Sequence, residues 1–109
     1  MIYREFREKK LSGLGLGMMR LPVIEGDDAS IDMARTAEII DYAYQNGINY
    51  FDTAWGYHNG NSELAAGQCL SAYPRESYYL ASKFPGYDNS NMPKGNLRRT
   101  VKKVHDSIL

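Results

Sequence analysis

The sequence contains one cysteine, Cys69, among its 109 residues. A single thiol cannot form a disulfide within the chain, and by itself it cannot hold a metal cluster. The sequence also lacks an apolar run long enough to cross a bilayer, and its first residues do not form a signal peptide. We therefore expect a cytoplasmic protein with no membrane partner.

An excess of charge of either sign is also missing, since 13 lysines and arginines balance 13 aspartates and glutamates. A net charge of zero gives no electrostatic reason to expect nucleic acid as a partner. The composition, 43% hydrophobic and 24% charged, is that of an ordinary globular protein, and the length allows one domain at most.

The N-terminal region is rich in glycine but lacks the dinucleotide-binding fingerprint. Gly13, Gly15 and Gly17 occur at every second residue, whereas that fingerprint needs a different spacing and a helix directly afterwards. Tyr3 and Phe6 are interspersed with the charged residues Arg4 and Glu5, and residues 7–10 read as a charged turn. We expect a short β-hairpin here, followed by an extended run over residues 11–18.

A first helix is predicted over residues 32–46. A polar loop is expected over residues 22–29, Ser30 is the candidate N-cap, and Gly47 is expected to end the helix. Apolar residues at spacings of four and three predict its buried face: Met33, Ala37, Ile40 and Tyr44.

Two further strand–helix units follow. Residues 48–53 are rich in β-branched and aromatic side chains and predict a strand, and residues 78–83, which begin with two tyrosines, are expected to form the next strand. A helix is predicted between them, from about Ser62 to Tyr73, and another is predicted from Asn96 onward after a loop. The expected cap of the earlier helix is Asn61 or Ser62, and its expected apolar face is Leu64, Ala65, Cys69 and Ala72.

The strand starts recur at the length of one βα repeat, roughly thirty to thirty-five residues. Right-handed helical crossovers make such strands parallel. An α/β fold follows, either an open doubly wound sheet or the first part of a (β/α)₈ barrel. In a barrel the site lies at the carboxyl ends of the strands, where Asp52, Tyr57 and Lys83 would fall.

These residues resemble the N-terminal signature of the aldo-keto reductases. The motifs that carry the resemblance are Asp52-Thr53-Ala54 with Tyr57, the Ser62-Glu63 helix start, Ala81-Ser82-Lys83, and the run from Leu14 to Pro22. The resemblance favours the N-terminal part of a TIM barrel, about three βα units preceded by a short β-hairpin. The sequence is most similar to bacterial members of the family, some of which carry a ferredoxin-like 4Fe-4S tail.

The resemblance implies the reduction of an aldehyde or ketone by hydride transfer from NADPH, with Tyr57 as proton donor. A tyrosine in water titrates near pH 10, and a neighbouring ammonium favours the phenolate. Lys83 would supply that ammonium, and Asp52 would hold Lys83 charged and oriented. Asp52, Tyr57 and Lys83 are therefore the predicted catalytic residues.

The resemblance also implies contacts with the cofactor and with a small carbonyl substrate. The predicted cofactor-side residues are Gly17, Met18, Met19, Arg20 and Asp52. Trp55 and His58 are predicted to contact the substrate, although Trp55 could equally pack beneath its loop. No residue is predicted to bind a metal.

Length sets a limit on this prediction. A complete barrel needs about 200 residues or more, so we expect residues 1–109 to be a truncated part of the domain. The fourth-strand histidine and the phosphate-binding region of the family would lie beyond Leu109. Open sheet edges could promote self-association.

Two other function classes remain open. One is a noncatalytic half-barrel that acts only through association. The other is a metal-dependent barrel hydrolase that uses Asp52, His58 and Glu63 as ligands. That hydrolase would leave Lys83 without a role.

Overall fold

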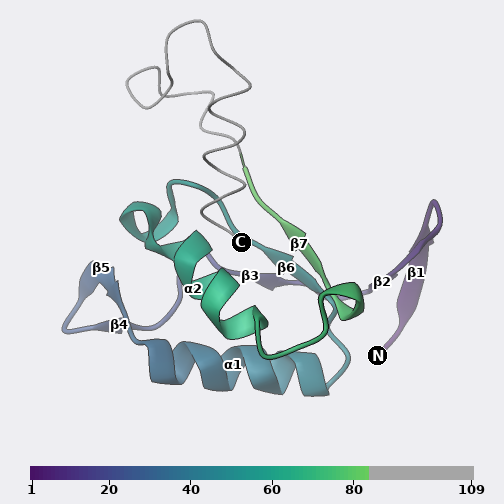
Figure 1. Cartoon of the computed structure of the whole chain (residues 1–109), viewed down its shortest axis with the longest axis horizontal. Coiled ribbons are helices and arrows are strands. Elements are labelled where there is room, and N and C mark those ends of the chain that lie inside the picture. The colour runs from purple at the N-terminus through teal and green to yellow at the C-terminus, as the bar shows by residue number, and fades with distance from the viewer. Residues whose placement is uncertain (84–109) are drawn as a thin grey trace, which may run out of the picture.

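A parallel sheet of three short strands forms the centre of the molecule. The computed structural model describes residues 1–83, and the helix predicted from Asn96 lies outside them (Figure 1). The strands are β3 (Leu16–Gly17), β6 (Tyr50–Asp52) and β7 (Tyr79–Ala81), in the order β3-β6-β7. The predicted parallel α/β architecture is confirmed.

The N-terminal hairpin is also confirmed, with a shorter turn than expected. Strand β1 (Tyr3–Phe6) pairs antiparallel with β2 (Lys9–Ser12), so the charged residues Lys9 and Lys10 belong to a strand. The predicted continuous extended run over residues 11–18 is wrong, because β2 ends at Ser12 and β3 begins only at Leu16.

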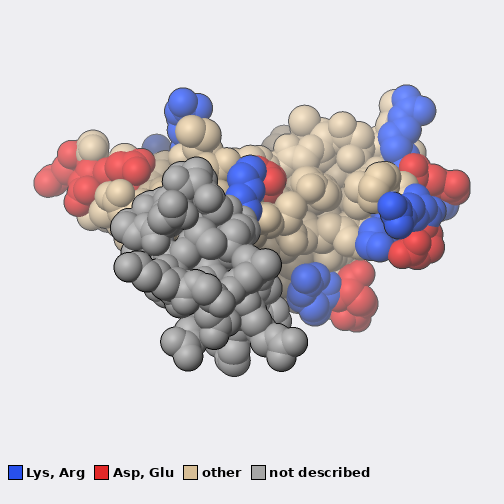
Figure 2. All heavy atoms as spheres, turned by 90° about the horizontal axis from the view of Figure 1, so that it is seen from above, with Lys and Arg blue, Asp and Glu red and all other residues tan. Residues whose placement is uncertain are grey.

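A second hairpin replaces the polar loop predicted over residues 22–29. Strand β4 (Val23–Ile24) pairs antiparallel with β5 (Asp27–Ile31). The turn residues Glu25 and Gly26 both have positive φ, 53° and 71°, which is the backbone of a tight hairpin turn. The polar composition of the segment concealed this pairing, because its side chains are mostly exposed. Figure 2 shows acidic side chains gathered at the end of the molecule where this hairpin lies.

Helix α1 spans Met33–Gln45, and its N-cap lies two residues after the predicted cap, Ser30. Asp32 is the N-cap, and its side chain accepts a hydrogen bond from the Arg35 N–H at 3.1 Å. The predicted cap, Ser30, lies in β5 and donates instead to Asp27. Gly47, with φ of 95°, follows the last turn as predicted.

The buried face of α1 differs partly from the prediction. Ile40 is fully buried, and Met33 and Tyr44 pack against the core, but Ala37 is exposed. Thr36 and Ala43 are buried in its place. The face that meets the sheet therefore runs along positions 36, 40 and 43, and Ala37 lies one residue off this line.

Helix α2 (Asn61–Leu70) follows the 3₁₀ turn η1 (Tyr57–Gly60). Its N-cap is Gly60, so the predicted capping by Asn61 or Ser62 is wrong. The helix ends before Tyr73, and the 3₁₀ turn η2 (Arg75–Ser77) precedes β7. The predicted apolar face is also partly wrong, since Leu64 and Ala72 are exposed and Cys69 is only half-buried. The buried residues are Ser62, Glu63, Ala65, Ala66 and Leu70.

One core joins the helices to the sheet. Phe51, Met18 and Ile40 are each 0% exposed and belong to the same apolar cluster. Figure 1 shows α1 and α2 beside the strands, with the β1–β2 hairpin at one end and the β4–β5 hairpin at the other. No helix within residues 1–83 is long and apolar enough to span a bilayer.

Candidate active site

The carboxyl ends of the three parallel strands lie at one level. Gly17 is in register with Asp52, and Asp52 is in register with Ala81. Lys83 follows Ala81 by two residues and Tyr57 follows Asp52 by five. The strand pairing thus places the predicted cofactor-side and catalytic residues on a common rim.

Asp52, Tyr57 and Lys83 lie together on this rim. The Lys83 Nζ donates to Asp52 Oδ2 at 2.7 Å. The same nitrogen lies 4.8 Å from the centre of the Tyr57 ring. The ion pair remains open to solvent, because the Lys83 and Asp52 side chains are 50% and 38% exposed.

The ammonium of Lys83 has a second acceptor, the Thr53 carbonyl oxygen at 3.0 Å. The pKa of Lys83 is raised, first by its hydrogen bond to Asp52 and further by its contact with Tyr57. The site therefore holds a positive charge beside a phenol. Such a charge favours the phenolate when the phenol loses its proton.

The loop that carries Tyr57 has an unusual backbone. His58 and Asn59 both have a φ of 53°, a region that few residues other than glycine occupy. Such a conformation persists only when the surroundings hold it. In this chain the His58 side chain supplies that support.

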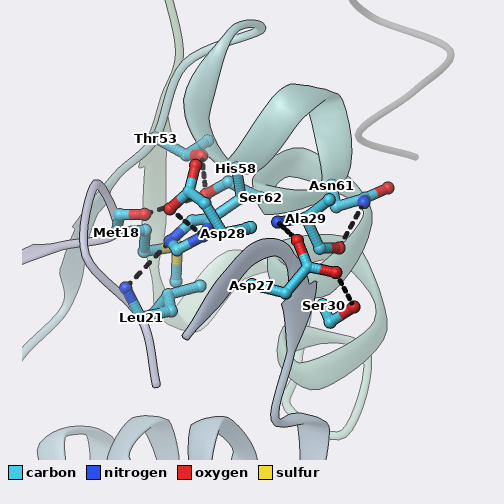
Figure 3. Close-up of polar contacts among 10 residues, drawn as sticks. All are labelled: Met18, Leu21, Asp27, Asp28, Ala29, Ser30, Thr53, His58, Asn61 and Ser62. Atoms are coloured by element: carbon cyan, nitrogen blue, oxygen red, sulfur yellow. Dashed lines mark hydrogen bonds and ion pairs between the residues drawn. The ribbon is translucent and has the colours of Figure 1, made fainter. Parts of the chain in front are cut away.

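His58 is 3% exposed, and its ring links three segments (Figure 3). Its Nε2 accepts a hydrogen bond from the Leu21 N–H at 2.9 Å, so Nε2 carries no proton. The proton therefore lies on Nδ1, which is 2.8 Å from the Asp28 carbonyl oxygen and donates to it. His58 thus ties the Tyr57 loop to the β4–β5 hairpin and to the segment after β3. Its predicted contact with the substrate stays a prediction, and these contacts do not favour it.

A second group of hydrogen bonds fixes the start of α2 beneath the same rim (Figure 3). The Ser62 hydroxyl donates to the Met18 carbonyl at 3.0 Å and lies 2.7 Å from the Thr53 hydroxyl. The Asn61 amide donates to the Ala29 carbonyl at 2.7 Å. The side chains first predicted to cap α2 therefore connect it to the strands and to the second hairpin.

The predicted cofactor-side residues divide into two groups. Gly17, Met19 and Arg20 are exposed, and among residues 1–83 nothing lies within 4 Å of the position that a Cβ on Gly17 would take. Met18 instead buries its side chain in the core. Their place on the cofactor side stays a prediction.

Trp55 and Glu63 lie at the edge of this arrangement. Trp55 is half-buried, and its backbone N–H donates to the Lys83 carbonyl at 3.4 Å. Glu63 is 1% exposed and accepts a hydrogen bond from the Ser82 hydroxyl. The sequence placed Glu63 at a helix start and, in the hydrolase alternative, made it a metal ligand. Its contact with Ser82, 19 residues away, has no signal in the sequence.

The hydrolase alternative needs Asp52, His58 and Glu63 to converge on one ion. Within residues 1–83, however, no three acidic, histidine or cysteine side chains come close enough to hold a metal. The geometry therefore gives that alternative no support.

The family model that matches the sequence is the aldo/keto reductase family, over residues 13–108. The chain belongs to the aldo/keto reductase family. Among curated relatives, it is 40% identical over 76 residues to the NADH-specific methylglyoxal reductase of Escherichia coli, and 37% identical over 81 residues to a probable aldo-keto reductase of Glycine max. These matches cover 67% and 69% of this chain but only 22% and 21% of the relatives.

Solved structures of the family share the fold. The holo form of an aldo-keto reductase from Bacillus halodurans is 25% identical with a TM-score of 0.72, over 99% of this chain and 36% of that chain. An aldo-keto reductase from Klebsiella pneumoniae, in complex with NADPH, is 18% identical with a TM-score of 0.71, over the same shares. The chain thus corresponds to the N-terminal portion of the family's TIM barrel. None of the relatives named here is described as having a 4Fe-4S tail, so that expectation stays a prediction.

Proposed function

We propose that the protein carrying this chain reduces an aldehyde or ketone to an alcohol, with Tyr57 as proton donor. The observation that carries the proposal is the contact of Lys83 with both Asp52 and the Tyr57 ring at the ends of parallel strands. The family supports it as well, since its name describes carbonyl reductases.

The proton would leave the Tyr57 hydroxyl for the carbonyl oxygen of the substrate. The Lys83 ammonium would stabilise the phenolate that remains, and Asp52 would keep Lys83 charged and oriented. General acid catalysis of this kind contributes about 10²–10⁴ in rate. Trp55 would provide an aromatic wall for an apolar carbonyl compound.

When bound, a nicotinamide cofactor would supply the hydride. Gly17, Met19 and Arg20, at the carboxyl end of β3, would contact the nicotinamide ring, and Asp52 would lie beside it. Met18 would contribute only its backbone, because its side chain is buried. The relatives differ in the cofactor they name, NADH in the E. coli protein and NADPH in the K. pneumoniae complex. NADPH is the cofactor that we propose, and both should be assayed.

The test is Tyr57→Phe in the natural-length protein, because this change keeps the ring and removes the proton donor. We expect kcat for carbonyl reduction to fall by about 10²–10⁴, with cofactor affinity retained. Tyr42→Phe is the matched control, since Tyr42 is 74% exposed on α1, and it should leave kcat unchanged.

Two results would count against the proposal. One is a Tyr57→Phe variant that reduces carbonyls at nearly the original rate. The other is a wild-type protein that binds neither cofactor, which would favour the noncatalytic half-barrel. Sedimentation of that same sample would show whether the open edges of β3 and β7 promote self-association.

A further inference from the structure

A carboxylate is buried directly behind the proposed site. Glu63 is 1% exposed, a degree of burial that charged residues rarely reach without partners. It lies in the first turn of α2, where the helix dipole favours a negative charge. The proposed proton transfer gives this carboxylate no part, so its position needs another explanation.

Glu63 contacts the segment that carries Lys83. Its Oε1 accepts a hydrogen bond from the Ser82 hydroxyl at 2.5 Å. Strand β7 ends at Ala81, and beyond it a long backbone hydrogen bond, from the Trp55 N–H to the Lys83 carbonyl at 3.4 Å, continues the contact with the segment after β6. The Ser82–Glu63 hydrogen bond therefore attaches this segment to helix α2.

The neighbouring residue, Ser62, makes equivalent contacts with the other strands. Its hydroxyl bonds to the Met18 carbonyl and to the Thr53 hydroxyl. The first turn of α2 thereby holds the residue that directly follows β3, the residue that directly follows β6, and the residue that directly follows β7. Each of these residues is next in sequence to one of the predicted site residues, namely Gly17, Asp52 and Lys83.

We propose that Glu63 and Ser82 are positioning residues for Lys83, a role that rests on the proposed function. The Lys83 side chain is flexible and half exposed, and its tip must reach Asp52 and the Tyr57 ring together. The Glu63–Ser82 hydrogen bond fixes the point from which this side chain extends. A misplacement of about 1 Å in such a site can cost about 10²-fold in rate.

The experiment compares Ser82→Ala with Ser82→Thr in the natural-length protein. Ser82→Ala removes the donor, and we expect kcat to fall by about ten- to a hundredfold while KM and cofactor Kd stay unchanged. Ser82→Thr keeps a hydroxyl and should recover most of the rate. Ser71→Ala is the matched control, because the Ser71 hydroxyl is exposed and bonds only locally, to the Gln68 carbonyl.

Two further readouts separate positioning from simple stabilisation. The alkaline limb of the pH–rate profile of Ser82→Ala should move in the same direction as that of Lys83→Met. Acetic anhydride labelling of Lys83, followed by peptide mass spectrometry, should be faster in Ser82→Ala than in wild type. A purely structural role would lower the melting temperature without either change. Glu63→Gln should show a smaller loss, because its amide oxygen can still accept the Ser82 hydrogen bond.

The proposal is overturned if Ser82→Ala keeps the wild-type kcat and labelling rate, or if Ser82→Thr is as impaired as Ser82→Ala. These failures are distinct from failure of the proposed function, which Tyr57→Phe reports. Faster Lys83 labelling in Ser82→Ala would support the positioning link even if no carbonyl were reduced.

Discussion

Lys83 and Asp52, which are 31 residues apart in the sequence, share a 2.7 Å ion pair at the ends of neighbouring strands. The pairing of β6 with β7 places Asp52 level with Ala81, so the lysine two residues later can reach the carboxylate. The site is therefore built by the sheet, and the electrostatics of Lys83 can be tested through its partner.

The first prediction concerns the pH dependence of stability in Asp52→Asn. The pKa of Lys83 is raised chiefly by Asp52. A cation with a raised pKa adds stability that is fully present below its unfolded value, near 10.4, and is lost as the pH rises through its folded value. Removing Asp52 should therefore lower the free energy of unfolding at pH 8 but have less effect at pH 11.

The expected loss at pH 8 is about 0.2–1 kcal/mol, because both side chains are well exposed. Urea unfolding of wild type and variant at the two pH values measures it. Glu38→Gln is a control on the exposed face of α1 and should show no pH-dependent difference. An Asp52→Asn loss that was equal at pH 8 and pH 11 would contradict the prediction.

The second prediction concerns Gly17→Leu. In the part of the chain that the structure describes, nothing lies within 4 Å of a Cβ at Gly17, so the fold should accept the new side chain with little change in melting temperature. That side chain would occupy the space proposed for the nicotinamide ring. We expect the Kd of NADPH and of NADH to rise by about tenfold or more, a loss of at least about 1.4 kcal/mol of binding free energy.

Fluorescence titration with both cofactors provides the measurement. Leu14→Ala serves as a control, because Leu14 is 61% exposed in the segment before β3. If Gly17→Leu bound both cofactors as tightly as wild type, Gly17 would not lie on the cofactor side.

The sequence predicted those features that depend on local pattern and on strand order. Parallel strands separated by helices place the residues at their carboxyl ends together, which is why the sequence predicts that Asp52 and Lys83 lie side by side. The N-terminal hairpin was predicted from Tyr3 and Phe6, interspersed with charged residues, and from the charged turn after them. Gly47 could be predicted to end α1 because glycine readily adopts positive φ.

Other features depended on contacts between distant segments, which local pattern does not encode. Ser62 has the chemistry of a helix cap, but its hydroxyl bonds to Met18 and Thr53 across the core. The position of His58 in a loop suggested a pocket residue. Only the fold shows that both of its ring nitrogens are hydrogen-bonded, to the Leu21 N–H and to the Asp28 carbonyl. In each case tertiary hydrogen bonding prevailed over the local preference.

The last prediction concerns His58→Asn. Asparagine is tolerated at the positive φ of this position, so the change tests the ring contacts with little added backbone strain. The shorter side chain cannot reach both the Leu21 N–H and the Asp28 carbonyl. Leaving a buried N–H without an acceptor costs about 1–3 kcal/mol, and we expect a loss of free energy of unfolding in that range by urea titration.

Asn59→Gly is the matched control, because the adjacent residue has the same φ of 53° but is exposed, and its effect should stay within about 0.5 kcal/mol. Kinetics then decide between two roles for His58. If His58 supports the Tyr57 loop, His58→Asn should lower the free energy of unfolding and kcat together and leave KM for small carbonyl compounds nearly constant. If His58 contacts the substrate, His58→Asn should raise KM and leave the free energy of unfolding unchanged. That outcome would support the original prediction that His58 lies in the substrate site.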